Sequence, residues 1–190
     1  EEIYGERVYC DGVFTLHGQG GFEQTNGQLD LAVSGDGFFV VDTPNGERYT
    51  RAGNFTINQL GELVTQEGYA VQGQNGNIVL NGNQIVFGEN GAVMVDGEAV
   101  DRLRIINFQM PQDFYKEGDS LYGLEAGRET EVVLQPQILQ GYLEQSNVSA
   151  VKQMVTMIEA VRSYEANQKV IRSGDETLAK TVNDVGRAQA

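Results

Sequence analysis

Cysteine and histidine, the side chains best suited to nucleophilic and metal chemistry, occur once each among the 190 residues, as Cys10 and His17. A zinc site needs three or four nitrogen, sulfur or oxygen ligands, so this pair falls short of one. A reactive thiol needs a neighbouring base or cation to lower its pKa, and we interpret Cys10 as an incidental small apolar residue. A single cysteine forms no disulfide within the chain. We therefore predict no metal site, no cofactor and no cysteine catalysis.

Carboxylates are the other source of chemistry, because the chain contains 27 Asp and Glu residues. A pair of them could act as the acid and the nucleophile of a glycosidase, and the sequence leaves that alternative open. The side-chain oxygens within residues 54–65 lack the dense spacing of a calcium-binding loop, and turn formation explains them better. No nucleophile motif or phosphate-binding loop is found. We predict that the chain is not an enzyme and has no small-molecule substrate.

The charge balance limits the possible partners. The formal net charge is −14 and the pI is about 4.3, so the chain repels nucleic acid unless its few cations cluster, and they do not. No apolar stretch approaches the length of a membrane span, and no signal peptide opens the sequence. We predict no nucleic-acid binding and no direct membrane insertion. Because the sequence begins at Glu1 without a methionine, we expect that an upstream segment is missing.

Closely spaced turn signals indicate β structure up to about residue 140. Asn-Gly pairs occur at residues 26, 45, 75, 81 and 90, and Asp-Gly pairs at 11, 36 and 96; both tolerate the positive φ of tight hairpin turns. Short β-type segments lie between these turns, at residues 29–33, 38–42, 48–50, 54–57, 62–65, 70–72, 77–80, 84–87, 92–95 and 103–108. Their spacing of roughly 8–12 residues is typical of an all-β domain built from hairpins.

One of these turns, Asp36-Gly37, predicts a hairpin between the apolar segments 29–33 and 38–41. Phe38 and Phe39 follow it and must point to opposite faces of their strand. One ring is expected in the core, while the other must be covered by something else or lie at an interface. The alternative, that both rings belong to the core, stays open.

After Gln135-Pro136 the pattern becomes helical, and Ser146, Asn147 and Ser149 are candidate N-caps. Apolar residues repeat every seven positions from about Val148 to Val185, with interruptions at Gln168 and Asp175. One register holds Met154, Val161 and Val182, and a second holds Met157, Tyr164, Ile171, Leu178 and Val185. Val151, Val155 and Ile158 widen this stripe. A helix of about 38 residues is roughly 57 Å long, and the first 140 residues offer no partner helix, so the pattern predicts an assembly protein.

Three blocks of sequence resemble the bacterial flagellar rod and hook proteins, and together they cover most of the chain. They are GGFEQTNGQLDLAVSGDGFFVV, GERYTRAGNFTINQLGELVTQEGYAV and LQGYLEQSNVSAVKQMVTMIEAVRSYEANQKVI. The first carries Thr25, Leu29, Asp30 and Gly37–Phe39; the second carries Tyr49–Arg51, Gly53 and Phe55; the third carries Gly141, Glu144, Ser146–Val148 and Tyr164.

The resemblance implies a structural subunit of the basal-body rod, with a connector over residues 1–28, a β domain over 29–140 and a C-terminal axial helix region over 141–190. In this family an N-terminal helix pairs with the C-terminal one, and we expect this sequence to begin in the connector that follows that helix. The β domain is small for a hook protein, which favours a rod type, and we predict the proximal type over the distal. The implied location is the periplasm-spanning rod, reached by type III export without a cleaved signal. The implied partners are copies of the chain and other rod or hook proteins.

The predicted assembly residues follow from the helical stripe and the motifs. Inter-helix packing is assigned to Met154, Met157, Ile158, Val161, Tyr164, Ile171 and Leu178. Asn147 and Arg162 are expected as polar neighbours, and Phe38 and Phe39 are expected to pack at the root of the β domain. Two alternatives remain: a hook protein, or an extracellular ligand-binding or adhesin β domain with a multimerising helix. The lack of tryptophan speaks against carbohydrate binding by the second.

Overall fold

The computed structural model describes residues 18–108, 114–118, 120–124, 128 and 130–187, and the side chains of these up to residue 181. Cys10 and His17, as well as most of the predicted connector, lie outside the described residues. The chain divides into two units, with the boundary between Asn147 and Val148. We call residues 18–147 the β unit; the second unit consists of the helix α1.

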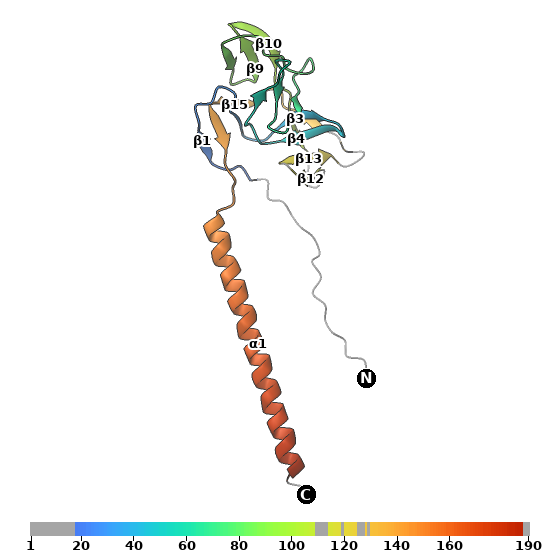
Figure 1. Cartoon of the computed structure of the whole chain (residues 1–190), viewed down its shortest axis with the longest axis vertical. Coiled ribbons are helices and arrows are strands. Elements are labelled where there is room, and N and C mark those ends of the chain that lie inside the picture. Colours follow the sequence, from blue (N-terminus) through green and yellow to red (C-terminus); the bar gives the residue numbers. More distant parts are fainter. Residues whose placement is uncertain (1–17, 109–113, 119, 125–127, 129, 188–190) are drawn as a thin grey trace. The chain divides into compact units, whose positions relative to one another are not determined.

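Within the described ranges, the chain forms sixteen strands and one helix (Figure 1), which confirms the predicted fold class. In chain order they are β1 Phe22–Gln24, β2 Leu31–Ser34, β3 Phe38–Thr43, β4 Gly46–Thr50, β5 Thr56–Ile57, β6 Leu63–Val64, β7 Ala70–Val71, β8 Ile85–Phe87, β9 Ala92–Val95, β10 Glu98–Arg102, β11 Ile105–Phe108, β12 Phe114–Gly118, β13 Leu121–Leu124, β14 Thr130–Val132, β15 Gln137–Gln140, β16 Tyr142–Glu144 and α1 Ala150–Arg187.

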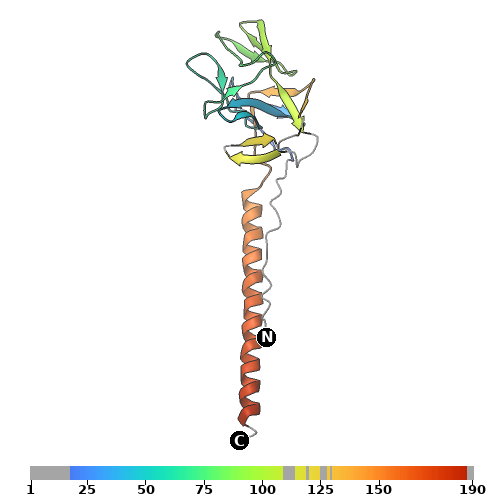
Figure 2. The ribbon, with the colours of Figure 1, turned by 90° about the vertical axis from the view of Figure 1, so that its right-hand side faces the viewer.

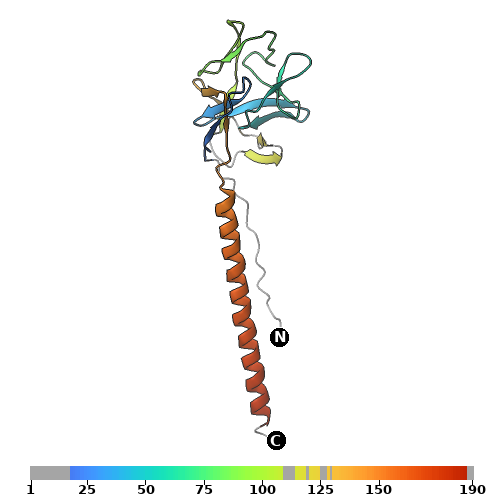
Figure 3. The ribbon, with the colours of Figure 1, turned by 60° about the vertical axis from the view of Figure 1, so that its left-hand side comes forward.

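The described strands form four sheets, and β3 is the central strand of the largest. Nine strands run in the order β12-β13-β4-β3-β7-β6-β5, with β11 pairing with both β3 and β14. The other sheets are β10-β9-β8, β15-β2 and β1-β16. Figures 2 and 3 show that late strands, drawn in orange, lie beside early strands, drawn in blue. The β unit is therefore closed by pairing between segments more than a hundred residues apart in the sequence.

Turn chemistry explains the hairpins that the sequence predicts. Asp96 and Gly97 join β9 to β10 in a two-residue turn. Such a turn requires positive φ, which both residue types tolerate, and their φ values are 51° and 88°. Asn58–Gly61 joins β5 to β6, where Ile57 pairs with Leu63. The predicted segment 77–80 forms only isolated bridges. Strands β1, β10 and β12–β16 are absent from the sequence prediction.

The predicted hairpin at Asp36-Gly37 is wrong. Strand β2 pairs with β15, whereas β3 pairs with β4, β7 and β11, so the turn leads from one sheet to another. Gly37 has φ of 148°, and a Cβ there would lie 2.6 Å from Cγ2 of Ile105, so the close passage over β11 explains the glycine. A turn signal states that the chain changes direction, and it carries no information about the strand that each arm will pair with.

Both faces of β3 are buried, because its side chains alternate between two apolar clusters. Phe39 and Val41 belong to the larger cluster, which also takes residues from β2, β8, β9 and β15 and so joins three sheets. Phe38 and Val40 belong to the smaller one, with Tyr49, Ile106 and Phe108. The prediction that the two phenylalanines face opposite sides is confirmed, and the alternative that both rings are core residues is the correct one.

The division at residues 28/29 and 140/141 remains a prediction. In the structure, residues on both sides of those limits take part in the β unit, because β1 pairs with β16. None of the described helices is long and apolar enough to cross a membrane.

Candidate assembly surface

Helix α1 presents the apolar residues that the sequence assigns to assembly. Ser149 is its N-cap: the backbone N–H of Lys152 donates to Ser149 Oγ at 3.4 Å, and the N–H of Gln153 donates to its carbonyl at 3.0 Å. The helix then continues for 38 residues, about 57 Å at the standard rise. Of the three predicted caps, the structure uses the last.

The described side chains of α1, up to Thr181, are all exposed except Gln168, which is half-buried. Met154, Met157 and Tyr164 are 65%, 69% and 64% exposed, and Ile171 and Leu178 are 63% and 65% exposed. Ile158 and Val161 are about half exposed, and Arg162 is exposed as well. Val182 and Val185, predicted in the same stripe, have side chains outside the described residues. The stripe therefore has no cover within the described chain.

The spacing of this stripe constrains what could cover it. We call Met157, Tyr164, Ile171 and Leu178 the seam; they follow one another at seven-residue intervals along α1. A straight helix drifts by about 20° per heptad relative to such a repeat, so a partner that follows the seam must wind in a left-handed supercoil. Burying one such side chain stabilises an assembly by roughly 1.5–3 kcal/mol before the entropy of ordering is subtracted. Several seam contacts could thus hold two helices together.

One of the two polar interruptions of the stripe, at Gln168, makes a hydrogen bond within the helix. Gln168 occupies a position where the heptad pattern calls for an apolar residue, and its Nε2 donates to the Tyr164 hydroxyl at 2.8 Å. A polar residue at such a position specifies register at some cost in stability. The Gln168–Tyr164 pair is therefore suited to fixing how a partner aligns along α1.

The other predicted assembly residues lie in the β unit. Phe39 is fully buried and packs edge-on against Phe55 at 5.0 Å between ring centroids; Phe38 is 7% exposed. Asn147 donates through Nδ2 to the carbonyl of Gly18 at 2.6 Å. Neither phenylalanine ring is available at the surface, so a role for them in assembly would be indirect, through the shape of the β unit. The structure thus brings the helical residues together and places these three elsewhere.

The sequence reasoning overlooked Arg51 and Glu144 as functional residues, although both stand inside the quoted motifs. Their side chains approach to 3.8 Å between Nε and Oε2 and are only 19% and 12% exposed. The signal in the sequence is their position within the blocks that resemble the rod and hook proteins. The pairing itself could not be seen, because the two residues are far apart in the sequence.

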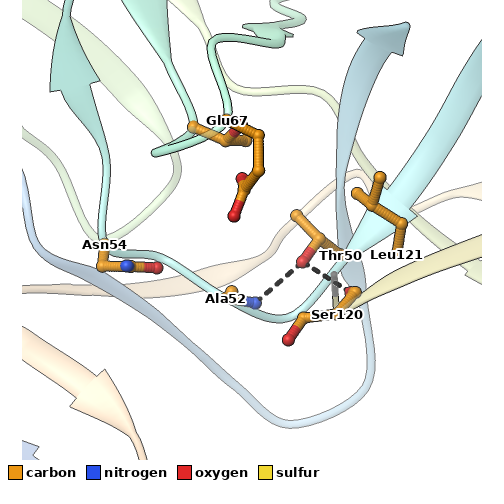
Figure 4. Close-up of a pocket in the computed structure, with 7 residues that line it drawn as sticks. Thr50, Ala52, Asn54, Glu67, Ser120 and Leu121 are labelled. Atoms are coloured by element: carbon orange, nitrogen blue, oxygen red, sulfur yellow. Dashed lines mark hydrogen bonds between the residues drawn. The ribbon is translucent and has the colours of Figure 1, made fainter. Parts of the chain in front are cut away.

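A pocket of about 170 Å³ lies between β4, β13 and the loop after β6 (Figure 4). Pockets that bury a small ligand are usually about 300–1,000 Å³. Its lining offers one carboxylate, Glu67, beside a hydroxyl, Thr50 Oγ1, that already donates to the Ser120 carbonyl at 2.9 Å. Among the described residues no group of three or more His, Cys, Asp or Glu side chains could hold a metal ion. This pocket therefore offers little for acid–base catalysis.

Ionic contacts elsewhere in the β unit stabilise its surface. Arg48 donates to Glu117, and this hydrogen bond lowers the pKa of the Glu117 carboxyl and raises that of the Arg48 guanidinium. The side-chain amides of Asn77 and Asn58 donate to Glu62 and lower the pKa of its carboxyl. These pKa shifts arise from hydrogen bonds at the surface. None of the groups involved lines the pocket.

Two protein-family models match this chain, one within the β unit and one over most of α1. Residues 32–95 match the model described as the flagellar hook protein FlgE/F/G D1 domain, and residues 139–184 match the flagellar basal body rod FlgEFG protein C-terminal region. The second match spans β16 and most of α1. The two models thus cover the centre of the β unit and the candidate assembly helix.

Individual relatives extend the similarity over nearly the whole chain. The flagellar basal-body rod protein FlgF of Caulobacter vibrioides is 35% identical over 95% of this chain and 75% of its own length. FlgG rod proteins of Buchnera aphidicola and Agrobacterium fabrum are each 36% identical, over 86% and 90% of this chain and 68% and 70% of their own lengths. The chain belongs to the family of flagellar basal-body rod proteins, as a structural subunit of the basal body.

Proposed function

We propose that this rod subunit assembles through α1, whose seam packs against helices of neighbouring copies and of other axial subunits. The observation that carries the proposal is the exposed seven-residue repeat on a helix of a chain that belongs to a rod family. An apolar stripe of this length is a liability in a monomer and is useful only where other helices cover it. The function is then mechanical, and the subunit passes torque along the rod without catalysing a reaction.

The charge distribution is compatible with this contact. Basic and acidic residues are interspersed along α1, for example Lys152, Glu159, Arg162 and Glu165, while all of the acidic excess lies before residue 148. Helices that carry both signs can pair without strong repulsion, as the flanks of coiled coils do. We therefore expect the contact to be made by α1 itself, with the acidic β units kept apart.

The position along the rod and the export route remain predictions. FlgF and FlgG rod proteins match at nearly the same identity, so similarity alone does not assign the proximal position that we predict. Type III export and the absence of enzymatic activity are likewise part of the proposal.

A pair of adjacent substitutions tests the role of the seam. Ile171 and Val170 are similarly exposed, at 63% and 71%, but only Ile171 belongs to the seam. In the full-length protein, Ile171→Asp should weaken self-association at least about tenfold, because a buried unpaired carboxylate is strongly unfavourable. Val170→Asp is the matched control and should change it less than about threefold. Sedimentation velocity over a concentration series measures both, and motility of a complemented deletion strain gives the cellular readout.

Equal effects of the two substitutions, or none from Ile171→Asp, would contradict the proposal. The first result would mean that any acid on α1 disturbs the helix, and the second that the seam lies outside the contact. Circular dichroism at 222 nm on both variants shows whether the helix itself has been preserved.

A further inference from the structure

The first and last described strands of the β unit form one antiparallel pair. In that pair, β1 and β16, Phe22 lies opposite Glu144 and Gln24 opposite Tyr142. Residues before Phe22 and after Glu144 therefore continue from the same end of the pair, which we call its open end. Pulling those two segments apart would load the cross-strand hydrogen bonds one after another, starting at this end. Two short strands held by backbone bonds alone are only marginally stable.

Polar contacts continue beyond the strands at the open end. The N–H of Gln145 donates to the carbonyl of Gly21 at 2.8 Å, and the side chain of Asn147 donates to the carbonyl of Gly18 at 2.6 Å. A Cβ on Gly20 would collide with the carbonyl oxygen of Gln145. The two segments thus approach so closely that only glycine fits at residue 20.

Glu144, the last residue of β16, contacts both the segment before β1 and Arg51. Its Oε1 accepts the N–H of Gly20 at 2.9 Å, and its Oε2 lies 3.8 Å from Nε of Arg51. Oε2 is buried and accepts no hydrogen bond from the described residues, so the guanidinium of Arg51 is the charge that compensates it. Removing one partner of such a poorly exposed pair leaves the other uncompensated, which is strongly unfavourable.

Arg51 is in turn anchored to the connection between β2 and β3. Its two terminal nitrogens both donate to the carbonyl of Gly35 at 2.9 Å, and its guanidinium lies 5.2 Å from the centre of the Phe38 ring. Gln19 adds a second tie, because its Nε2 donates to the carbonyl of Val33 at 2.9 Å. A planar guanidinium presents five donors in a fixed fork and stacks on an aromatic ring, whereas a lysine has three rotatable donors on a point charge.

We propose that Arg51 and Glu144 form a lock that prevents β1 and β16 from peeling apart when force acts along the chain through α1. The proposal rests on the proposed function, because only a subunit that transmits torque through α1 would experience this load. Through the Glu144–Gly20 hydrogen bond, the lock joins the end of β16 to the segment before β1. Through the contact of Arg51 with Phe38, it joins both to the centre of the nine-stranded sheet. Force entering at residue 147 is then passed to the core of the β unit and not to two short strands alone.

Single-molecule pulling on the full-length protein, with handles at its two ends, tests the lock. Glu144→Gln keeps an acceptor for the Gly20 N–H but removes the charge that faces Arg51, so the β1–β16 pair should open at lower force. The zero-force opening rate should rise on the order of tenfold, as expected when a poorly exposed charge loses the opposite charge that compensates it. Arg51→Lys should act in the same direction. Glu47→Gln, which breaks the more exposed Glu47–Arg104 pair, is the matched control and should leave the opening force unchanged.

The direction of pulling separates a lock from a general contribution to stability. Handles on Asn45→Cys and Glu98→Cys, in a Cys10→Ser background, load the β unit elsewhere, and there Glu144→Gln should have little effect. Hydrogen exchange supplies a second readout: the amides of Gly20 and Gln145 should exchange about tenfold faster, while those of β3 stay protected.

Equal opening forces for Glu144→Gln and Glu47→Gln would overturn the lock, and so would equal losses in both pulling directions. The Ile171→Asp variant distinguishes this failure from failure of the proposed function, because unchanged self-association of this variant contradicts only the proposed function. It should keep the wild-type opening force if the lock is real, whatever its effect on self-association.

Discussion

Replacing Phe39 by alanine should destabilise the β unit far more than replacing an exposed apolar residue. The ring is fully buried, packs against Phe55, and belongs to the cluster that joins three sheets. Truncating a buried phenylalanine costs about 3–5 kcal/mol through lost burial and the remaining cavity. Against a total stability of about 5–15 kcal/mol for a domain, this should lower the unfolding midpoint by roughly 10–20 °C.

Urea unfolding, followed by tyrosine fluorescence because the chain has no tryptophan, measures this loss. Leu60→Ala is the control: Leu60 is 76% exposed at the tip of a turn, and its loss should change the free energy of unfolding by less than about 0.5 kcal/mol. Phe38→Ala should also be costly, since its ring contacts Phe108 and Tyr122 at 5.1 and 5.5 Å. A loss below about 1 kcal/mol for Phe39→Ala, at an unchanged urea slope, would refute the assignment of this ring to the centre of the core.

Two further predictions concern the helix and the acid stability of the β unit. Gly174 lies inside α1, and a Cβ added there would meet no heavy atom within 4 Å outside the helix's own adjacent backbone. Gly174→Ala should therefore stabilise the helix by about 1 kcal/mol and strengthen the circular dichroism signal at 222 nm. A weaker signal would mean that the local geometry requires glycine. The carboxyls of Glu117 and Glu62 have lowered pKa values, so their stabilising contribution is present above their ordinary value of 4.5 and is lost as the pH falls through the folded value. Glu117→Gln should accordingly flatten the loss of stability as the pH falls below 4.5, and an unchanged pH profile in urea unfolding would contradict this.

Features with a local cause were predictable from the sequence. The apolar repeat that predicts α1 lies within one continuous stretch of sequence. The helix also begins after a serine that can cap it. The turn at Asp96-Gly97 is fixed by two residues that tolerate positive φ. Alternation along β3 is enough to place Phe38 and Phe39 on opposite faces, whichever strands pair with it.

Strand partners were beyond the reach of the same reasoning. Ile138 pairs with Val33, and Glu144 with Phe22, and no property of either segment alone encodes that choice. The hairpin predicted at Asp36-Gly37 is wrong for this reason, since the turn signal leaves open which strand each of its arms pairs with. The Arg51–Glu144 contact cannot be read from the sequence because its two residues meet only after such long-range pairing has formed.

The contrast between the two units bears on why the lock should exist. Within the β unit, β3 is buried on both faces, and the Arg51 guanidinium is engaged by Gly35, Phe38 and Glu144. The described part of α1 leaves its apolar side chains exposed and would gain stability from a helix that covers them. On the proposed function, such a subunit receives force through α1. That force must then cross residues 144–150 to reach the core, so a charge pair at this crossing, anchored on the central sheet, is where strengthening would have the greatest mechanical effect.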